Sequence, residues 1–149
     1  MAVVAERYRI ACWTILRHAK PRQTNPYGES RLNIVGVRNP STAINSFDDR
    51  VVIVYRDEAG KQMALEYPIT TDPGAHYTKS ELMNKDGAAI LVPGQYVNTY
   101  GLGKHRGKYE ALCETGGPVR VWRDGNRDDR LDRSGRIYEG VFWINIHRA

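Results

Sequence analysis

Residues 50–70, RVVIVYRDEAGKQMALEYPIT, constrain the fold of this chain more than any other stretch. An apolar run at 51–55 leads into the turn sequence Asp-Glu-Ala-Gly. Apolar and polar side chains then alternate along 62–68, which is the period of a β-strand. Two such runs around a short turn that contains glycine predict an antiparallel pair of strands.

Short apolar runs between Gly and Pro turns continue on both sides of this pair. We expect further strands in LNIVGVRNP, on both sides of Pro-Gly in AAILVPGQYVNTY, in PVRVWR and in the final GVFWINIHRA. The stretch YEALCETGG is expected to be a short helix around 108–114 that ends at its glycine pair. Many short strands and little helix predict a mainly β fold, either a β-sandwich or a curled sheet.

The chain has 149 residues, which is the size of one domain. We expect the β domain to span 32–149 and residues 1–31 to form an N-terminal arm and linker. Within the arm, 3–18 fits a short amphipathic helix or an extended segment. The arm is rich in arginine and aromatic side chains, which suit protein interfaces. It is therefore expected to dock the domain onto other proteins.

Charge and composition narrow the classes of partner. The formal net charge of +5 suits an anionic partner, such as nucleic acid or a cell-wall polymer. The basic residues are scattered and do not interleave with aromatic ones, so nucleic acid is not the expected partner. No apolar run reaches the roughly 18 residues of a membrane span. Glu6, Arg7 and Arg9 interrupt the N-terminus where a signal peptide is apolar, so we expect synthesis in a bacterial-type cytoplasm without a classical export signal.

The final stretch places a histidine at the end of a predicted strand. With period two, the core face of that strand would hold Phe142, Ile144 and Ile146. The opposite face would hold Val141, Trp143, Asn145 and His147. A strand-end imidazole either packs or caps a neighbour, or it acts as a general base at the mouth of a groove.

Several blocks of the chain resemble an L,D-transpeptidase catalytic domain: SFDDRVVIVYRDEAGKQMALEYPITTDPG, AILVPGQYV and WINIHRA. The runs GQYVNTYGLGKHRGKYEAL, VRVWRDGNRD and INIHRA are similar to a group of phage and prophage proteins. The resemblance covers about residues 32–149. It implies a peptidoglycan-directed domain that acts on stem peptides by acyl transfer from a cysteine, with His147 as the catalytic base.

The same resemblance also shows two departures. The phage proteins continue past Ile-His-Arg with a Ser-x-Gly-Cys segment that supplies the nucleophile, and residues 1–149 contain no such segment. Arg148 stands where the enzymes usually have Gly. Cys12 and Cys113 are expected to be small buried hydrophobes rather than substitutes for that nucleophile.

Two functions therefore remain open. The first is a phage virion component, a tail or tail-tip protein, whose domain binds peptidoglycan and is inactive in residues 1–149. The second is an active cell-wall enzyme that works by Cys/His acyl transfer once residues beyond Ala149 are included. Location in the virion, or in the bacterial cytoplasm before assembly, follows from the first.

The substrate contacts are expected from residues near the two histidine stretches, GKHRGK and WINIHRA. These residues are His105, Arg106, Trp143, Asn145 and Arg148. His105 lies among cationic neighbours, which would favour its neutral form, and it could contact a peptide carboxylate.

A separate polar loop, DGNRDDRLD, predicts a Ca²⁺ site. Asp124, Asn126 and Asp128 alternate, and Asp132 follows at the ninth position, which resembles the first part of a calcium loop. The glycine and glutamate that complete such a loop are absent from its sixth and twelfth positions. The alternative is a solvated turn whose acids are neutralised by Arg127, Arg130 and Arg133.

Overall fold

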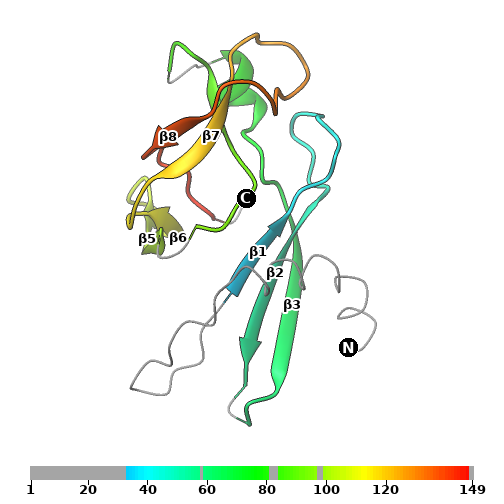
Figure 1. Cartoon of the computed structure of the whole chain (residues 1–149), viewed down its shortest axis with the longest axis vertical. Coiled ribbons are helices and arrows are strands. Elements are labelled where there is room, and N and C mark those ends of the chain that lie inside the picture. The colour runs from blue at the N-terminus through cyan, green and yellow to red at the C-terminus, as the bar shows by residue number, and fades with distance from the viewer. Residues whose placement is uncertain (1–32, 58, 81–83, 97–98, 148–149) are drawn as a thin grey trace. The chain divides into compact units, whose positions relative to one another are not determined.

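The computed structural model describes residues 33–57, 59–80, 84–96 and 99–147 and has the expected mainly β fold (Figure 1). Its strands are β1 (Asn33–Val37), β2 (Asp49–Arg56), β3 (Gln62–Ile69), β4 (Ala88–Leu91), β5 (Tyr100–His105), β6 (Tyr109–Glu114), β7 (Val119–Asp124) and β8 (Tyr138–Gly140). One π-helical turn, η1 (His76–Ser80), lies in the expected loop after β3. The predictions made for 1–31, for Cys12 and for Arg148 fall outside the described residues.

These residues form two compact units. The N-terminal unit comprises 33–40 and 46–71, and the C-terminal unit comprises 41–45 and 72–147. Each unit has its own sheets, so each is described separately.

The N-terminal unit is a three-stranded antiparallel sheet in the order β1-β2-β3. The register of β2 and β3 runs from Asp49 opposite Ile69 to Arg56 opposite Gln62, so the predicted strand pair is confirmed. Its turn closes where the amide of Lys61 donates to the side chain of Asp57 at 2.8 Å.

In this sheet the buried face is not the one that carries the large apolar side chains of β3. Val35, Val52 and Val54 form the core. They share a face with the small or polar positions of β3, because Val52 stands opposite Glu66 and Val54 opposite Ala64. Leu65 and Tyr67, on the other face, are exposed.

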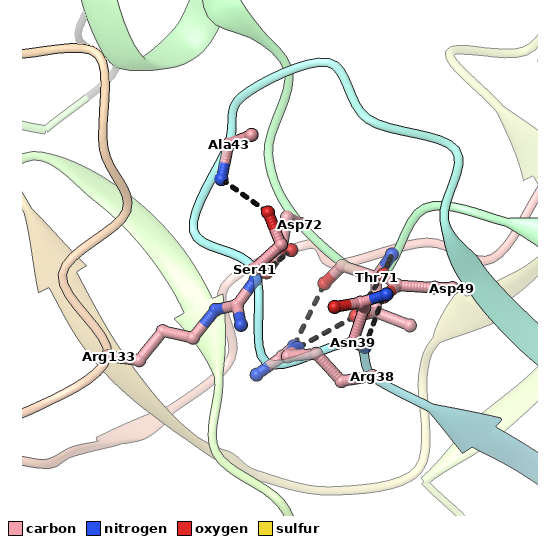
Figure 2. A network of polar contacts seen from close by, with 8 residues as sticks. All are labelled: Arg38, Asn39, Ser41, Ala43, Asp49, Thr71, Asp72 and Arg133. Atoms are coloured by element: carbon pink, nitrogen blue, oxygen red, sulfur yellow. Dashed lines mark hydrogen bonds and ion pairs between the residues drawn. The ribbon is translucent and has the colours of Figure 1, made fainter.

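A buried carboxylate joins the two segments that follow β1 and β3 at one end of this sheet. Asp49 is 1% exposed. One of its oxygens accepts the amide of Asn39 at 2.7 Å, and the other accepts the amide and the hydroxyl of Thr71 at 2.6 and 2.7 Å. Figure 2 shows this carboxylate between the two segments. Both oxygens of Asp49 are therefore used.

The C-terminal unit contains a three-stranded sheet, β4-β7-β8, and a two-stranded sheet, β5-β6. All of these strand pairs are antiparallel. Ile90, Val119 and Val121 are fully buried and centre the core on β4 and β7. Arg133 and Asp72 form a half-buried ion pair at 2.5 Å (Figure 2).

The helix expected around 108–114 is wrong, because this segment is strand β6. Its residues pair with β5 from Tyr100 opposite Glu114 to His105 opposite Tyr109. The composition Glu-Ala-Leu favours a helix locally, but pairing with a glycine-rich strand overrides this weak preference.

The strand expected through the final stretch is also wrong beyond its start. Strand β8 ends at Gly140, and residues 141–147 then make a single bridge, from Ile146 to Leu112. Trp143 has a left-handed φ of 60°, which breaks the period-two alternation between Val141 and His147. No helix in the described part of the chain is long and apolar enough to cross a membrane.

Candidate functional site

The structure brings His147 and His105 together. Their ring centroids lie 4.2 Å apart with the planes tilted by 36°. His105 is the last residue of β5. His147 follows the Ile146 bridge, so both imidazoles stand at the hairpin formed by β5 and β6.

Tyr109 and Asn145 complete this histidine cluster, which we define as His105, Tyr109, Asn145 and His147. The hydroxyl of Tyr109 lies 3.4 Å from Nδ1 of His147, and its ring stacks on His105 at 5.4 Å. The side-chain nitrogen of Asn145 lies 3.1 Å from Nδ1 of His105. Each imidazole therefore has a polar neighbour at Nδ1.

The orientation of Asn145 sets the protonation of His105. Its oxygen accepts the amide of Glu114 at 3.3 Å, so its NH₂ group faces the imidazole as a donor. Nδ1 of His105 must then be an acceptor, and the ring proton lies on Nε2. Burial, followed by the positive charges of His147 and Arg106, lowers the pKa of His105. The cluster thus pairs a neutral imidazole with a more exposed one.

Glu114 explains how the chain reaches this position. It is 2% exposed, and one carboxylate oxygen accepts the amides of both Phe142 and Ile144 at 3.1 Å. The left-handed Trp143 between them turns both amides onto the same oxygen, as in a backbone nest around an anion. A side chain from β6 therefore replaces the missing strand partner of this segment.

The other oxygen of Glu114 has no hydrogen-bond partner in the described residues, and neither has the buried hydroxyl of Tyr100. These two residues stand opposite each other on β6 and β5. Burial and the nearby Glu114 carboxylate raise the pKa of Tyr100 to about 12. The phenol therefore stays neutral beside the carboxylate.

The other residues considered for the site, Arg106, Trp143 and Cys113, lie outside the histidine cluster. Arg106 is exposed at the turn after β5, where it donates to the hydroxyl of Tyr77. Trp143 is 74% exposed at the bend, so its indole is accessible. Cys113 is half-buried on β6, and the described contact of its sulfur is with the carbonyl of Ala111 at 4.0 Å.

The predicted calcium loop has a specific arrangement. The NH₂ group of Asn126 donates to Asp128 and to Asp132, both at 3.1 Å. The amide donor thus stands between two carboxylates, as a cation would. Within the described ranges, no group of three or more His, Cys, Asp or Glu side chains is arranged to hold a metal ion.

Asp124 lies at the end of β7 and is buried next to this loop. Burial, followed by the charges of Asp132 and Asp128, raises its pKa to about 6. An open hollow of about 430 Å³ borders the loop, lined by Thr42, Asp128, Arg130, Leu131, Asp132, Arg133 and Ser134. Two aspartates and two arginines thus face this solvent-open hollow.

Comparison with known proteins finds no match: no family model, no curated protein and no solved structure matches the chain. The class of protein is therefore argued from the cluster and from the sequence blocks that surround it.

Two members of the site were not found from the sequence. Tyr109 follows a turn in GKHRGKY, and only its pairing with His105 reveals its role. Glu114 was hidden in a segment expected to be helical. Glu114 stands between Cys113 and Thr115 at the end of β6, so no local pattern marks it as a buried carboxylate.

Proposed function

We propose that residues 32–149 form a peptidoglycan-directed domain of the L,D-transpeptidase type, carried by a phage tail or tail-tip protein. The observation that carries this proposal is the histidine cluster at the end of the β5–β6 hairpin. It supports a site that can hold a proton next to a peptide carbonyl or carboxylate. The sequence blocks that surround the cluster supply the class of ligand.

Within this proposal His147 is the base and His105 is its neutral neighbour. A neutral imidazole in ring contact with the base supports it without adding a second positive charge. Asn145 and Tyr109 fix the two rings through their Nδ1 atoms. The exposed indole of Trp143 offers a flat apolar surface to a bound peptide.

The alternative function is an active cell-wall enzyme. Acyl transfer of this type needs a thiol that gives its proton to His147, attacks the peptide carbonyl as thiolate and expels an amine, which takes the proton from His147. Cys113 is on β6 with its sulfur near a main-chain carbonyl, so we do not assign it this role. The nucleophile would come from a Ser-x-Gly-Cys segment beyond Ala149, as the resemblance implies.

Binding of a purified disaccharide–tetrapeptide to residues 1–149 tests the proposal. We expect amide and imidazole NMR shifts at His105, Tyr109 and His147, and loss of affinity of about tenfold in His147→Gln. His76→Gln is the matched control, because His76 is an exposed histidine outside the cluster. Absence of shifts at the cluster, or equal loss in both variants, would contradict the proposal.

A measurement of turnover separates the two functions. We expect no release of amine from the tetrapeptide by residues 1–149. A chain extended by a Ser-x-Gly-Cys segment is expected to turn over, and to lose this activity in His147→Gln. Detection of the protein in purified particles by mass spectrometry tests the virion assignment directly.

A further inference from the structure

Strand β5 pairs with β6 along one edge, and its other main-chain edge faces away from β6. The bridge between Leu112 and Ile146 consists of two hydrogen bonds, each of 2.9 Å, that run in both directions. The main-chain N–H and C=O of Leu112 therefore point toward Ile146 and away from β5. Since Leu102 is the residue opposite Leu112, this is a non-hydrogen-bonded pair of the β5–β6 ladder.

It follows that the N–H and C=O of Leu102 point outward from the hairpin. The same holds for Tyr100, two residues earlier, because hydrogen-bonded and non-hydrogen-bonded pairs alternate. No main-chain hydrogen bond to Leu102 from another described segment is present. The side chain of Leu102 is 91% exposed, so the edge is open around this residue in the described part of the chain.

We propose that the outer edge of β5 binds an extended acidic peptide as an added strand. An exposed edge of this kind provides main-chain hydrogen bonds to a peptide, and neighbouring side chains select its sequence. Here the selecting side chains are Lys104, Arg106 and Lys108 at the end of the hairpin, of which only Lys104 has an acid, Glu110, opposite it. The surplus of positive charge favours a peptide that carries carboxylates.

The same charges argue against a second copy of this chain as the occupant. The outer edge of β5, YGLGKH, carries no carboxylate, so an identical edge from a second copy offers nothing that complements the basic residues. A peptide with side-chain or terminal carboxylates instead gains from both the edge and the charge.

This inference deepens the proposed function and rests on it only for the identity of the natural peptide. Strand β5 ends at His105, so an added strand runs alongside the hairpin toward the histidine cluster. Stem peptides carry free carboxylates, which is the chemistry that the edge selects. The end of an added strand would thus lie beside His105, the member of the cluster that belongs to β5 itself.

The test uses residues 1–149 and a synthetic peptide, acetyl-Thr-Glu-Val-Glu-Thr-Glu with a free C-terminus. Leu102→Pro removes the outward N–H but no hydrogen bond between β5 and β6, and proline is tolerated on edge strands. Leu102→Val is the matched control, because it changes the side chain and keeps the N–H. We expect Leu102→Pro to weaken binding at least tenfold and Leu102→Val to change it less than twofold.

The fully N-methylated peptide gives an independent measurement on the unaltered protein, since it keeps the charges and lacks the N–H donors. It is expected to bind at least tenfold more weakly, even if Leu102→Pro fails to fold. Equal binding of the two peptides, or equal affinity for a peptide with Lys in place of Glu, would overturn the inference. So would a dimer in sedimentation that Leu102→Pro dissociates, because the edge would then belong to a second copy.

The outcome also separates this inference from the proposed function. If the acidic peptide binds at β5 while the disaccharide–tetrapeptide does not bind, the edge site stands and the peptidoglycan assignment fails. If the tetrapeptide shifts the histidine cluster equally in Leu102→Pro and in the unaltered protein, the assignment stands and the edge site fails.

Discussion

Each of the two units contains one buried carboxylate that holds main-chain amides, and the two carboxylates are used differently. In the N-terminal unit Asp49 engages three donors with both of its oxygens. In the C-terminal unit Glu114 engages two amides with one oxygen, and the other oxygen has no partner among the described residues. The first arrangement is saturated, whereas the second has an unused acceptor next to the candidate site.

The difference indicates what each carboxylate contributes. Asp49 joins the segments that follow β1 and β3 at one end of a regular sheet, whose strands already pair along their length. Glu114 instead holds the segment 141–147, for which the described residues show a single β-bridge, from Ile146 to Leu112. A buried acceptor without a partner costs stability, on the order of 1–3 kcal/mol. Such a cost is typical of sites where geometry serves function rather than stability.

The largest expected effect is that of Asp49→Asn. Asparagine must place an NH₂ group where an oxygen accepts an amide, so at least one donor faces another donor. We expect the free energy of unfolding of the N-terminal unit to fall by about 3 kcal/mol. Urea unfolding followed by near-ultraviolet circular dichroism measures this change. A loss below about 1 kcal/mol would show that the carboxylate is not saturated.

The next effect is a gain of stability in Asp124→Asn. The pKa of Asp124 is raised to about 6 from its ordinary value of 3.8, so the folded state binds this proton more tightly than the unfolded state. The resulting stability is present below pH 3.8 and is lost as pH rises through about 6. Asparagine imitates the protonated form. At pH 7 we therefore expect the variant to be more stable by on the order of 1 kcal/mol.

Measurement of this gain across pH provides its own control. The difference between Asp124→Asn and the unaltered protein should shrink as pH falls from 7 to 4, because the aspartate then becomes neutral as well. A difference that is constant with pH would assign the effect to packing instead of to the charge.

Glu114→Gln should change stability less than Asp49→Asn. The glutamine oxygen can accept the amides of Phe142 and Ile144, and its NH₂ group takes the position of the unpartnered oxygen. Loss of the buried charge offsets the weaker hydrogen bonds, so we expect a change within about 1 kcal/mol. Glu110→Gln, on the exposed part of the same strand, is the control. A loss as large as that of Asp49→Asn would remove the contrast between the two carboxylates.

The smallest effect is that of Ca²⁺ on the loop from Asp124 to Asp132. We propose weak binding, with a dissociation constant of about 1 mM, as in extracellular modules. At 1 mM Ca²⁺ the stabilisation is then about 0.4 kcal/mol. Thermal unfolding with and without Ca²⁺ measures it, and Asp128→Asn should abolish it. No shift at 10 mM Ca²⁺ would mean that the NH₂ group of Asn126 already takes the place of the cation.

The sequence predicted the parts of the fold that depend on neighbouring residues. The pair β2–β3 follows from alternation on both sides of a short turn, and β1 and β7 follow from compact apolar runs. The pattern did not show which face of β3 is buried. Val52 and Val54 define the core, and this leaves Leu65 and Tyr67 toward solvent.

The parts that the sequence did not predict depend on distant contacts. The bend at Trp143 is set by Glu114, which lies 28 and 30 residues from the amides that it binds. The meeting of His105 with His147 depends on the same contact. His147 and Asn145 could be proposed from the final stretch alone, but their relation to Tyr109 requires the strand β6 that local composition concealed.

The single bridge at Ile146 has a consequence for the order in which the molecule folds. The hairpin β5–β6 closes over a short turn, and hairpins of this kind form in roughly 1–10 μs. Asn145 reaches His105 across 40 residues of chain, so its arrival costs more loop entropy. During folding, the stacked pair of His105 and Tyr109 is therefore expected to form before His147 contacts it. The last segment can also detach while the hairpin persists, and its amides should exchange with solvent well before those of β5 and β6.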